Sequence, residues 1–428
     1  MNKWDLSQAL SAIQEKRQEL FALGQTLFDL PEPGFFEFDT AAQITAFLKR
    51  HGIPYRDRIA RTGVIATIGE GSFHIALVVD MDALLVNHNG KLVPFHSCGH
   101  SIQVAVGLYV LLVLEQTGWF DATGLKFSLF ATPAEEFIDL KRRRELMDKG
   151  EIQYPSGKQQ MIASSLFDDV SCVLSLHVGS SHDAAFDVGG TLSGFCVRQA
   201  LFQGLTAHSG AFAHEGRNAL HAASLCLSAL SFLTEQFPHE SGIQLHPILT
   251  APATSLNLIP DQISVESYLR AYDFEDLARL QDGFARAAVH CAEALGVKAS
   301  ITATPGYLPL KPNEVLSRML KNSMQRVSPD SRIVENPVSG ASGDIGDLSF
   351  LLPCAQFGFS GYSGRIHSDD FIISNPEHAY LDTAMVLVST IHDLIHTRPI
   401  PDGKPAYESN KQWYLKEWLS QSCQDQSN

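Results

Sequence analysis

The sequence predicts an α/β fold with a mostly parallel sheet, into which a smaller α+β unit is inserted. Two observations lead to this prediction. Apolar, strand-like runs alternate with amphipathic helical segments over most of the chain, which is typical of a parallel sheet covered by helices on both faces. From about Gly189 to Pro305 the pattern changes to β-α-β-β-α-β, which is typical of a split β-α-β, ferredoxin-like unit.

The first part of the chain alternates helices and buried strands. Apolar residues recur at helical spacing over residues 5–29, and a second helix is expected to stop at Gly52. A buried helix is expected from about residue 101 to 117. The expected strands are TGVIATIG (62–69), HIALVVDM (74–81), LKFSLFAT (125–132) and SCVLSLHV (171–178).

The inserted unit is expected to hold helices at about 216–236 and 273–295 and to end with the strand KASITATP (298–305). The α/β pattern then returns with a helix near 312–326, the short strand AQFGFS and a final helix after Pro376. The expected division is 1–187 and 306–398 for the larger unit, 188–305 for the inserted unit and 399–428 for a polar C-terminal tail.

Composition and charge exclude several classes of protein. A chain of 428 residues that is 45% hydrophobic has enough apolar material for large cores, which excludes disorder. The net charge of -15 opposes binding to nucleic acid or to anionic membranes. Seven cysteines without C-x-x-C spacing favour a reducing compartment, and the polar N-terminus does not read as a secretory signal. We therefore expect a cytoplasmic protein that acts on a small molecule.

Polar side chains follow several of the expected strands, where open parallel sheets place their ligand crevice. Each group alone has an ordinary explanation: Cys98 as a small core residue, His177 as a hydrogen-bonded core histidine, and Glu135-Glu136 as the acidic start of a helix. Together, thiolate, imidazole and carboxylate groups favour a zinc or manganese site. The candidates are Asp80-Met-Asp82, His96-Ser-Cys98-Gly-His100, Glu135-Glu136, His177, and His367 in a Gly-rich loop.

The order of these motifs resembles that of the metal-dependent amidohydrolase and peptidase family that contains aminoacylases, hippurate hydrolases, auxin-conjugate hydrolases and aminobenzoyl-glutamate hydrolases. The resemblance covers residues from about 10 to 397, and the segment from ATPAEE through GKQQMI is most similar to the aminobenzoyl-glutamate branch. The motifs are DMDALL, HSCGH, ATPAEE, SLHV, GLTAHSG, GRNAL, NLIPD and a histidine in a Gly-rich loop.

The resemblance implies a catalytic domain with two divalent ions, zinc or manganese, and an inserted lid and dimerisation domain. Cys98 would take the bridging position between the ions, Glu135 matches the general base, and Asp82 matches the aspartate that orients a ligand. The other implied metal ligands are His100, Glu136, His177 and His367.

Three residues of the inserted unit match further functional positions of the family. His208 matches a histidine that reaches the site of a partner subunit, while Asn257 and Arg270 match positions near the substrate's carbonyl and carboxylate groups. Ordinary explanations stay open for all three residues. His208 would then cap a turn, Asn257 would order one before Pro260, and Arg270 would be a surface strand residue.

The implied function is hydrolysis of the amide bond of an N-acyl or aminobenzoyl amino acid by metal-activated water, with Glu135 as general base, in a homodimer. Two alternatives stay open: a dipeptidase with the same di-metal chemistry, and a catalytically silent metal-binding dimer. Ser101 raises the second alternative, because the family usually has Asp or Asn after C-G-H, and Gln103 stands near the place of a histidine. A weaker hydrogen-bonding group there would orient His100 less well.

Overall fold

A computed structural model of the chain describes residues 4–119, 124–179, 183–252, 255–397 and 404–420. It divides into two compact units. The first unit contains Met1–Thr191, Lys311–Ser339 and Asp347–Lys411, and the second contains Leu192–Leu310, Gly340–Gly346 and the described residues from Gln412 onwards. No helix within the described ranges is long and apolar enough to cross a membrane.

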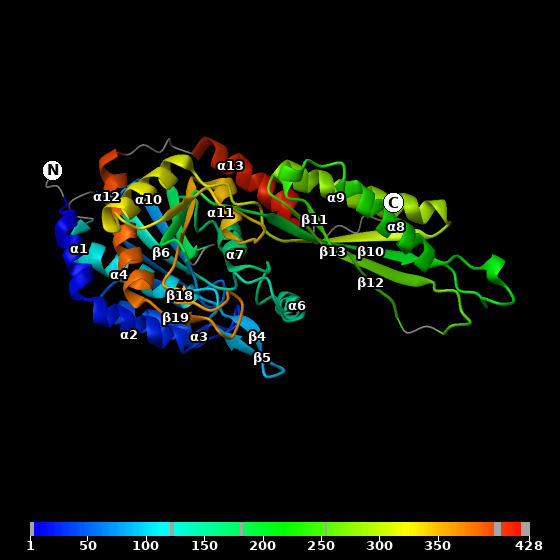
Figure 1. Cartoon of the computed structure of the whole chain (residues 1–428), viewed down its shortest axis with the longest axis horizontal. Coiled ribbons are helices and arrows are strands. Elements are labelled where there is room, and N and C mark those ends of the chain that lie inside the picture. Colours follow the sequence, from blue (N-terminus) through cyan, green and yellow to red (C-terminus); the bar gives the residue numbers. More distant parts are fainter. Residues whose placement is uncertain (1–3, 120–123, 180–182, 253–254, 398–403, 421–428) are drawn as a thin grey trace. The chain divides into compact units, whose positions relative to one another are not determined.

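The first unit, on the left in Figure 1, is built on an eight-stranded sheet in the order β1-β2-β6-β3-β7-β17-β8-β15. Strand β3 pairs parallel with β6 and β7, and β7 pairs parallel with β17, which confirms the expected mostly parallel α/β fold. The strands are β1 (Tyr55–Ile59), β2 (Gly63–Ile68), β3 (His74–Asp80), β6 (Lys126–Thr132), β7 (Cys172–Val178), β8 (Phe186–Val188), β15 (Ile333–Glu335) and β17 (Cys354–Phe359).

Helix α4 (His100–Gln116) is the centre of the main core. It is buried along nearly its whole length, contacts β3 and β6, and is enclosed by other helices of this unit. The single helix expected over residues 5–29 is two helices, because Lys16 leaves the helical conformation between them. The other helices are α1 (Leu6–Glu15), α2 (Arg17–Phe28), α3 (Phe38–Arg50), α6 (Leu140–Asp148), α7 (Gly157–Ala163), α10 (Glu314–Val327), α11 (Ile345–Leu351) and α12 (Thr383–Thr397), which continues a π-helical turn at Glu377–Asp382.

Short antiparallel pairs complete the rim of the first unit. The hairpin of β4 (Leu84–His88) and β5 (Lys91–Phe95) leads from the end of β3 to the start of α4 and has no counterpart in the strands expected from the sequence. Strands β18 (Tyr362–Ser363) and β19 (Ile372–Ile373) flank the loop of His367. A further two-stranded sheet pairs β9 (Thr191–Leu192) with β16 (Val338–Ser339).

The second unit is an antiparallel sheet with two helices. Its strands follow the order β11-β13-β10-β14, with β12 also paired to β13, and α8 packs beside α9 against β10 and β13. Two short strands stand where one was expected between α8 and β13. The elements are β10 (Gly194–Gln203), α8 (Ala219–Thr234), β11 (Gln244–Leu245), β12 (Ile248–Thr250), β13 (Gln262–Ala271), α9 (Phe274–Ala294) and β14 (Lys298–Pro305), with 3-10 turns at Ala213–Glu215 and His239–Ser241.

The C-terminal segment, expected as a polar tail, contains helical structure. Helix α13 spans Lys404–Trp413 and continues into a π-helical turn at Tyr414–Trp418. Both Tyr414 and Trp418 are buried, so part of this segment is packed rather than solvated.

Candidate metal centre

The candidate centre is assembled at the ends of β3, β6 and β7 and at the start of α4, all in the first unit. Gly99 joins Cys98 to His100 and has φ +75°, in the left-handed region that glycine tolerates. A Cβ at this position would lie 2.5 Å from Cγ1 of Val178, so the turn also needs glycine for space. The turn makes His100 the first residue of α4 and leaves Cys98 immediately before it.

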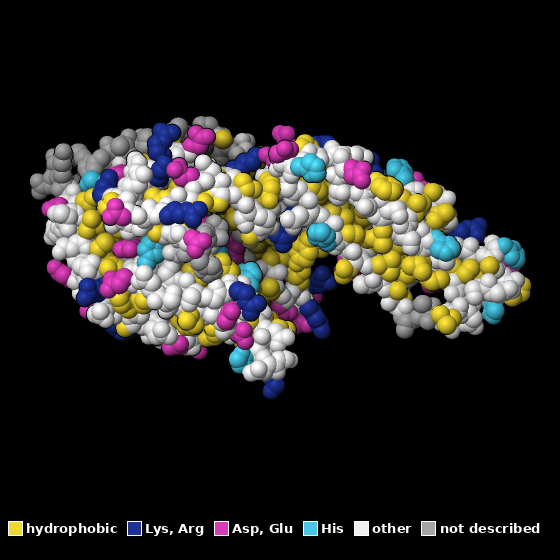
Figure 2. Space-filling view, in the orientation of Figure 1, with side chains coloured by type: hydrophobic (Ala, Val, Ile, Leu, Met, Phe, Trp, Pro, Cys, Tyr) yellow, Lys and Arg dark blue, Asp and Glu magenta, His cyan; other side chains and the backbone are white. Residues whose placement is uncertain are grey.

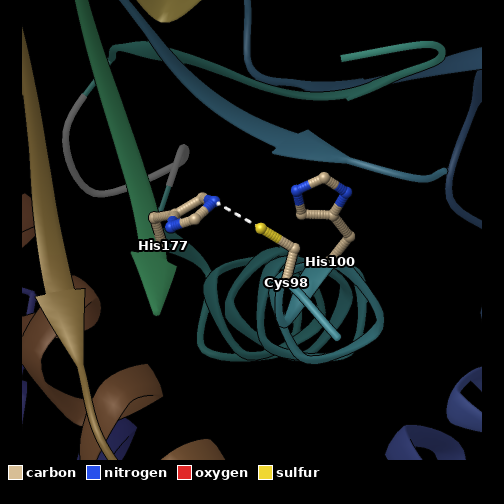
Figure 3. Close-up of side chains that lie close together, drawn as sticks. All are labelled: Cys98, His100 and His177. Carbon is tan, nitrogen blue, oxygen red and sulfur yellow. Dashed lines mark hydrogen bonds between the residues drawn. The ribbon is translucent and has the colours of Figure 1, made fainter. Parts of the chain in front are cut away.

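The Cys98 thiol points between the imidazole rings of His177 and His100 (Figure 3). Its Sγ lies 3.4 Å from Nε2 of His177, at the end of β7, and 3.3 Å from Nε2 of His367. The candidate ligand atoms form three groups, and within each group all atoms lie within 4.8 Å of one another. They are Cys98-His100-His177, Cys98-Glu136-His367 and His100-Glu135-Glu136.

Asp82 connects the start of α4 to the turn after β6 through hydrogen bonds. Its backbone carbonyl accepts a hydrogen bond from Nδ1 of His100 at 2.8 Å. Its carboxylate accepts the backbone N–H groups of Glu135 and Glu136, both at 3.1 Å. Asp82 therefore fixes the position of one candidate ligand directly and of both glutamates through their backbone.

Hydrogen bonds to carbonyl groups leave Nε2 of two histidines as the ring atom that could bind a metal. A carbonyl oxygen only accepts, so Nδ1 of His100, bonded to Asp82, carries a proton, and Nε2 presents its lone pair when the ring is neutral. Nδ1 of His177 lies 3.2 Å from the carbonyl of Val178, with the same consequence. Burial lowers the pKa of His177 to about 4, so this imidazole is neutral at pH 7, as a metal ligand must be.

The acidic groups of the centre share a basic neighbour, His100. Burial lowers the pKa of His100, but hydrogen bonds to Asp82 and Cys98 outweigh it and the pKa is raised. Burial raises the pKa of Glu136 to about 7, and it raises the pKa of the Cys98 thiol well above its ordinary value. Glu135 and Glu136 are both buried, and so is Asp82. A bound cation would favour the ionised form of each of these groups.

Two buried polar atoms of the centre have no hydrogen-bond partner among the described residues. They are Nε2 of His100 and Oε1 of Glu136, and both belong to the ligand groups given above. A buried polar atom without a partner is costly, and an ion that the structure does not contain is one explanation. Sulfur, imidazole nitrogen and carboxylate oxygen are the donor set of zinc sites, so these residues fit a divalent metal.

Asp80, at the end of β3, is neutralised by a lysine that was not among the candidate residues predicted from the sequence. Lys158, on α7, is fully buried and forms an ion pair with the Asp80 carboxylate. Thr132 donates a further hydrogen bond to Asp80 at 2.6 Å. Burial alone would raise the pKa of Asp80, but Lys158 outweighs it and the pKa is lowered.

The two positions that depart from the resembled family have different surroundings. The side-chain oxygen of Gln103 accepts the backbone N–H of Asp80 at 2.9 Å, so Gln103 supports the end of β3. Ser101 is buried, and its hydroxyl has no hydrogen-bond partner among the described residues. His96, from the same motif, faces the carbonyl of Leu30 at 3.3 Å and lies outside the ligand groups.

His208, Asn257 and Arg270 lie in the second unit. Nδ1 of His208 accepts the N–H groups of Gly210 and Ala211, both at 3.2 Å, and the side chain is exposed. Asn257 is exposed, and its backbone carbonyl accepts the N–H of Ser209.

Arg270 is only partly exposed, because its guanidinium group packs inside the second unit. The group donates to the Gly340 carbonyl at 2.9 Å and to the Ser342 hydroxyl at 3.0 Å. It also lies over the rings of Phe195 and Tyr268. Arg270 therefore holds the segment of Gly340 and Ser342 against β13.

Comparison with known proteins shows the family of the chain. Residues 76–393 match the model of peptidase family M20/M25/M40. The chain belongs to this family. As an M20 member it is a hydrolase of the peptidase and amidohydrolase class.

Matches to relatives and to solved structures cover most of the chain. N-acetyl-L-cysteine deacetylase of Bacillus subtilis is 25% identical over 365 residues, which are 81% of each chain. The mouse Xaa-Arg dipeptidase is 24% identical over 420 residues, 92% of this chain and 90% of that protein. A crystal structure of a Bacillus subtilis dinuclear metal-binding M20 peptidase has a TM-score of 0.71 and 18% identity, and the match covers 90% of this chain and 99% of that one. At this identity the structural likeness shows a shared fold.

Proposed function

We propose that this chain is a di-metal amidohydrolase that cleaves the amide bond of an N-acyl amino acid. The observation that carries the proposal is the pair of unpartnered buried atoms, Nε2 of His100 and Oε1 of Glu136, inside a compact cluster of ligand atoms within the described residues. When bound, divalent ions such as zinc or manganese polarise the amide carbonyl and lower the pKa of water.

Cys98 is the proposed bridging ligand. It belongs to two of the three ligand groups, one with His100 and His177 and the other with Glu136 and His367. A shared thiolate between two pairs of ligands supports a centre for two ions rather than one.

Glu135 is the proposed general base. Its carboxylate lies beside the ligand cluster, with Oε2 3.8 Å from Nε2 of His100. Only 10% of its side chain is exposed, which supports a carboxyl group able to both accept and release a proton. In this role Glu135 takes the proton of the attacking water on a carboxylate oxygen and delivers it to the nitrogen of the departing amine.

The second unit is proposed to bind the substrate and to form a homodimer. The two hydrogen bonds of Arg270 use Nη1, and a guanidinium group has further N–H donors that suit a substrate carboxylate. Asn257 is proposed to contact the substrate carbonyl. Figure 2 shows hydrophobic side chains gathered over this unit, and Phe232 and Ile248 are 66% and 59% exposed. Such a surface suits a second copy of the chain, in which His208 would reach the partner's site.

A substrate panel tests the proposed class. Amine release is measured from N-acetyl-L-cysteine, other N-acyl amino acids and aminobenzoyl-glutamate, in parallel with free dipeptides that end in arginine. We expect release from the acylated compounds. The similarity to Xaa-Arg dipeptidase over 92% of the chain favours a dipeptidase as the second candidate, and preference for unblocked dipeptides would establish it instead.

A further inference from the structure

The turn that carries Glu135 and Glu136 has an unusual backbone. It follows β6, and Ala134 adopts φ +58°, in the left-handed region that residues with a Cβ rarely occupy. Such a conformation persists only where the surroundings hold it in place. The groups that hold this turn therefore also determine where the two glutamate side chains point.

Buried carboxylates accept all three N–H groups of the turn. Asp82 accepts those of Glu135 and Glu136. Oε1 of Glu37 accepts the N–H of Ala134 at 2.9 Å, and Oε2 of the same side chain accepts the hydroxyl of Thr62 at 2.5 Å. Glu37 comes from the segment just before α3, 97 residues away from Ala134 in the chain.

One guanidinium group binds the carbonyl side of the same turn. Arg143, on α6, donates to the carbonyl oxygens of Ala134 and Glu136 and to that of Pro155. Its side chain is almost fully enclosed, with 4% exposed, and Glu37 is completely buried. The turn is thus held by Glu37 at an N–H group and by Arg143 at two carbonyl groups.

Close packing brings these segments together. Phe35 and Ala134 share a small hydrophobic cluster with Leu146 of α6. Gly34 is needed for this contact, because a Cβ there would lie 2.8 Å from Cα of Ala134 and 2.9 Å from Nη2 of Arg143.

Glu37 and Arg143 both carry polar groups that are costly to bury. Each satisfies backbone groups of one turn, and that turn carries both glutamates of the centre. We propose that Glu37 and Arg143 are positioning residues that act through the Ala134–Glu136 backbone to place the Glu135 and Glu136 carboxylates. This inference rests on the proposed function, because it assigns the purpose of the turn to catalysis.

A pair of substitutions at Glu37 tests the inference. Glu37→Ala removes the acceptor of the Ala134 N–H, whereas Glu37→Gln keeps an amide oxygen there. With the best substrate of the panel, we expect Glu37→Ala to lower kcat by about 10- to 100-fold with KM unchanged, and Glu37→Gln to restore most of it. Arg143→Lys serves as a second variant, because an ammonium group keeps the charge but cannot span two carbonyl groups as the guanidinium does.

A control separates positioning from loss of stability. Lys411→Met breaks the half-buried ion pair with Asp168, outside the turn, and should lower the unfolding temperature without changing kcat. Unchanged kcat in folded, metal-loaded Glu37→Ala would overturn the inference. Equal loss in the Ala and Gln variants would overturn it as well, because the acceptor would then not matter.

Hydrogen exchange gives a readout that does not depend on activity. In the wild type, the amides of residues 134–136 should exchange slowly, and Glu37→Ala should accelerate exchange in this peptide while Lys411→Met leaves it unchanged. Unaltered exchange in Glu37→Ala would contradict the positioning role. If the wild type releases no amine from any substrate, the proposed function fails, while the exchange measurement still decides whether Glu37 holds the turn.

Discussion

Asp80 and Lys158 form an ion pair that is enclosed within the first unit, with 3% and 1% of their side chains exposed. The pair neutralises the carboxylate at the end of β3 without any metal ion. The acidic groups that lack such a lysine partner are those of the candidate ligands and Glu135, beside His100, and this is where divalent ions would bind.

Removing one partner of this pair should destabilise the fold strongly. Lys158→Met leaves Asp80 buried without its cation, and we expect a loss of about 3–5 kcal/mol in the free energy of unfolding. The double variant with Asp80→Asn should recover most of that loss, because neither charge is then buried alone. Urea unfolding of metal-loaded protein measures both effects. Equal stability of Lys158→Met and the wild type would contradict the prediction.

Glu135→Gln should separate metal binding from turnover. The amide keeps the size of the side chain and the backbone bond to Asp82, so bound metal should be unchanged. Turnover should fall by about 100- to 10,000-fold, because the amide cannot take the proton of the attacking water. Amine release and elemental analysis on the same preparation check both parts. A variant with normal turnover would remove Glu135 as the base.

Ser101→Ala should leave metal affinity and activity unchanged. The Ser101 hydroxyl has no hydrogen-bond partner among the described residues, and Nδ1 of His100 is held by Asp82 instead. Removing a buried hydroxyl without a partner is expected to be neutral or slightly stabilising. Titration of metal-free protein with manganese provides the test. A clear loss of affinity would show that Ser101 does support His100.

The stabilisation conferred by metal should increase with pH. In metal-free protein, burial raises the pKa of Glu136 from 4.5 to about 7. The contribution of Glu136 to stability is therefore fully present below about pH 4.5 and is lost as the pH rises through about 7. Metal binds the ionised carboxylate and offsets this loss, whereas neutral His177 contributes no change in this range.

The measurement for this pH effect is the difference in unfolding temperature between metal-loaded and chelated protein. It should widen from about pH 5 to about pH 8. Glu37, whose pKa burial raises to about 8, is present in both forms and cancels in the difference. A difference that stays constant over this range would show that ionisation of Glu136 is not linked to binding.

Much of the fold was predictable because its signals are local. The apolar runs at residues 62–69, 74–81, 125–132 and 171–178 correspond to β2, β3, β6 and β7. Parallel pairing then brings their carboxyl ends to one edge of the sheet, so the order of the motifs already indicated that Cys98, Glu136 and His177 would meet. The break at Lys16 was not predicted, because the helical periodicity of apolar residues continues past it. The β4–β5 hairpin was not predicted, because its sequence has little strand-like alternation.

The supports of the centre were not predictable, because they depend on contacts between distant segments. Lys158 lies 78 residues from Asp80 in the chain, and Glu37 lies 97 residues from Ala134. In the sequence, Lys158 and Arg143 stand in polar stretches that are typical of solvated helices, yet both are buried. Arg143 is turned inward by the carbonyl groups of the turn after β6, and Lys158 by the Asp80 carboxylate at the end of β3.

The central claim is that this chain holds two divalent ions and uses them to hydrolyse an acylated amino acid. Its most direct test is the metal content of protein purified without chelator, paired with amine release from N-acyl amino acids with and without added manganese or zinc. We predict about two ions per chain, together with release that chelation abolishes and metal restores. Protein that retains no metal and releases no amine under any of these conditions would contradict the claim.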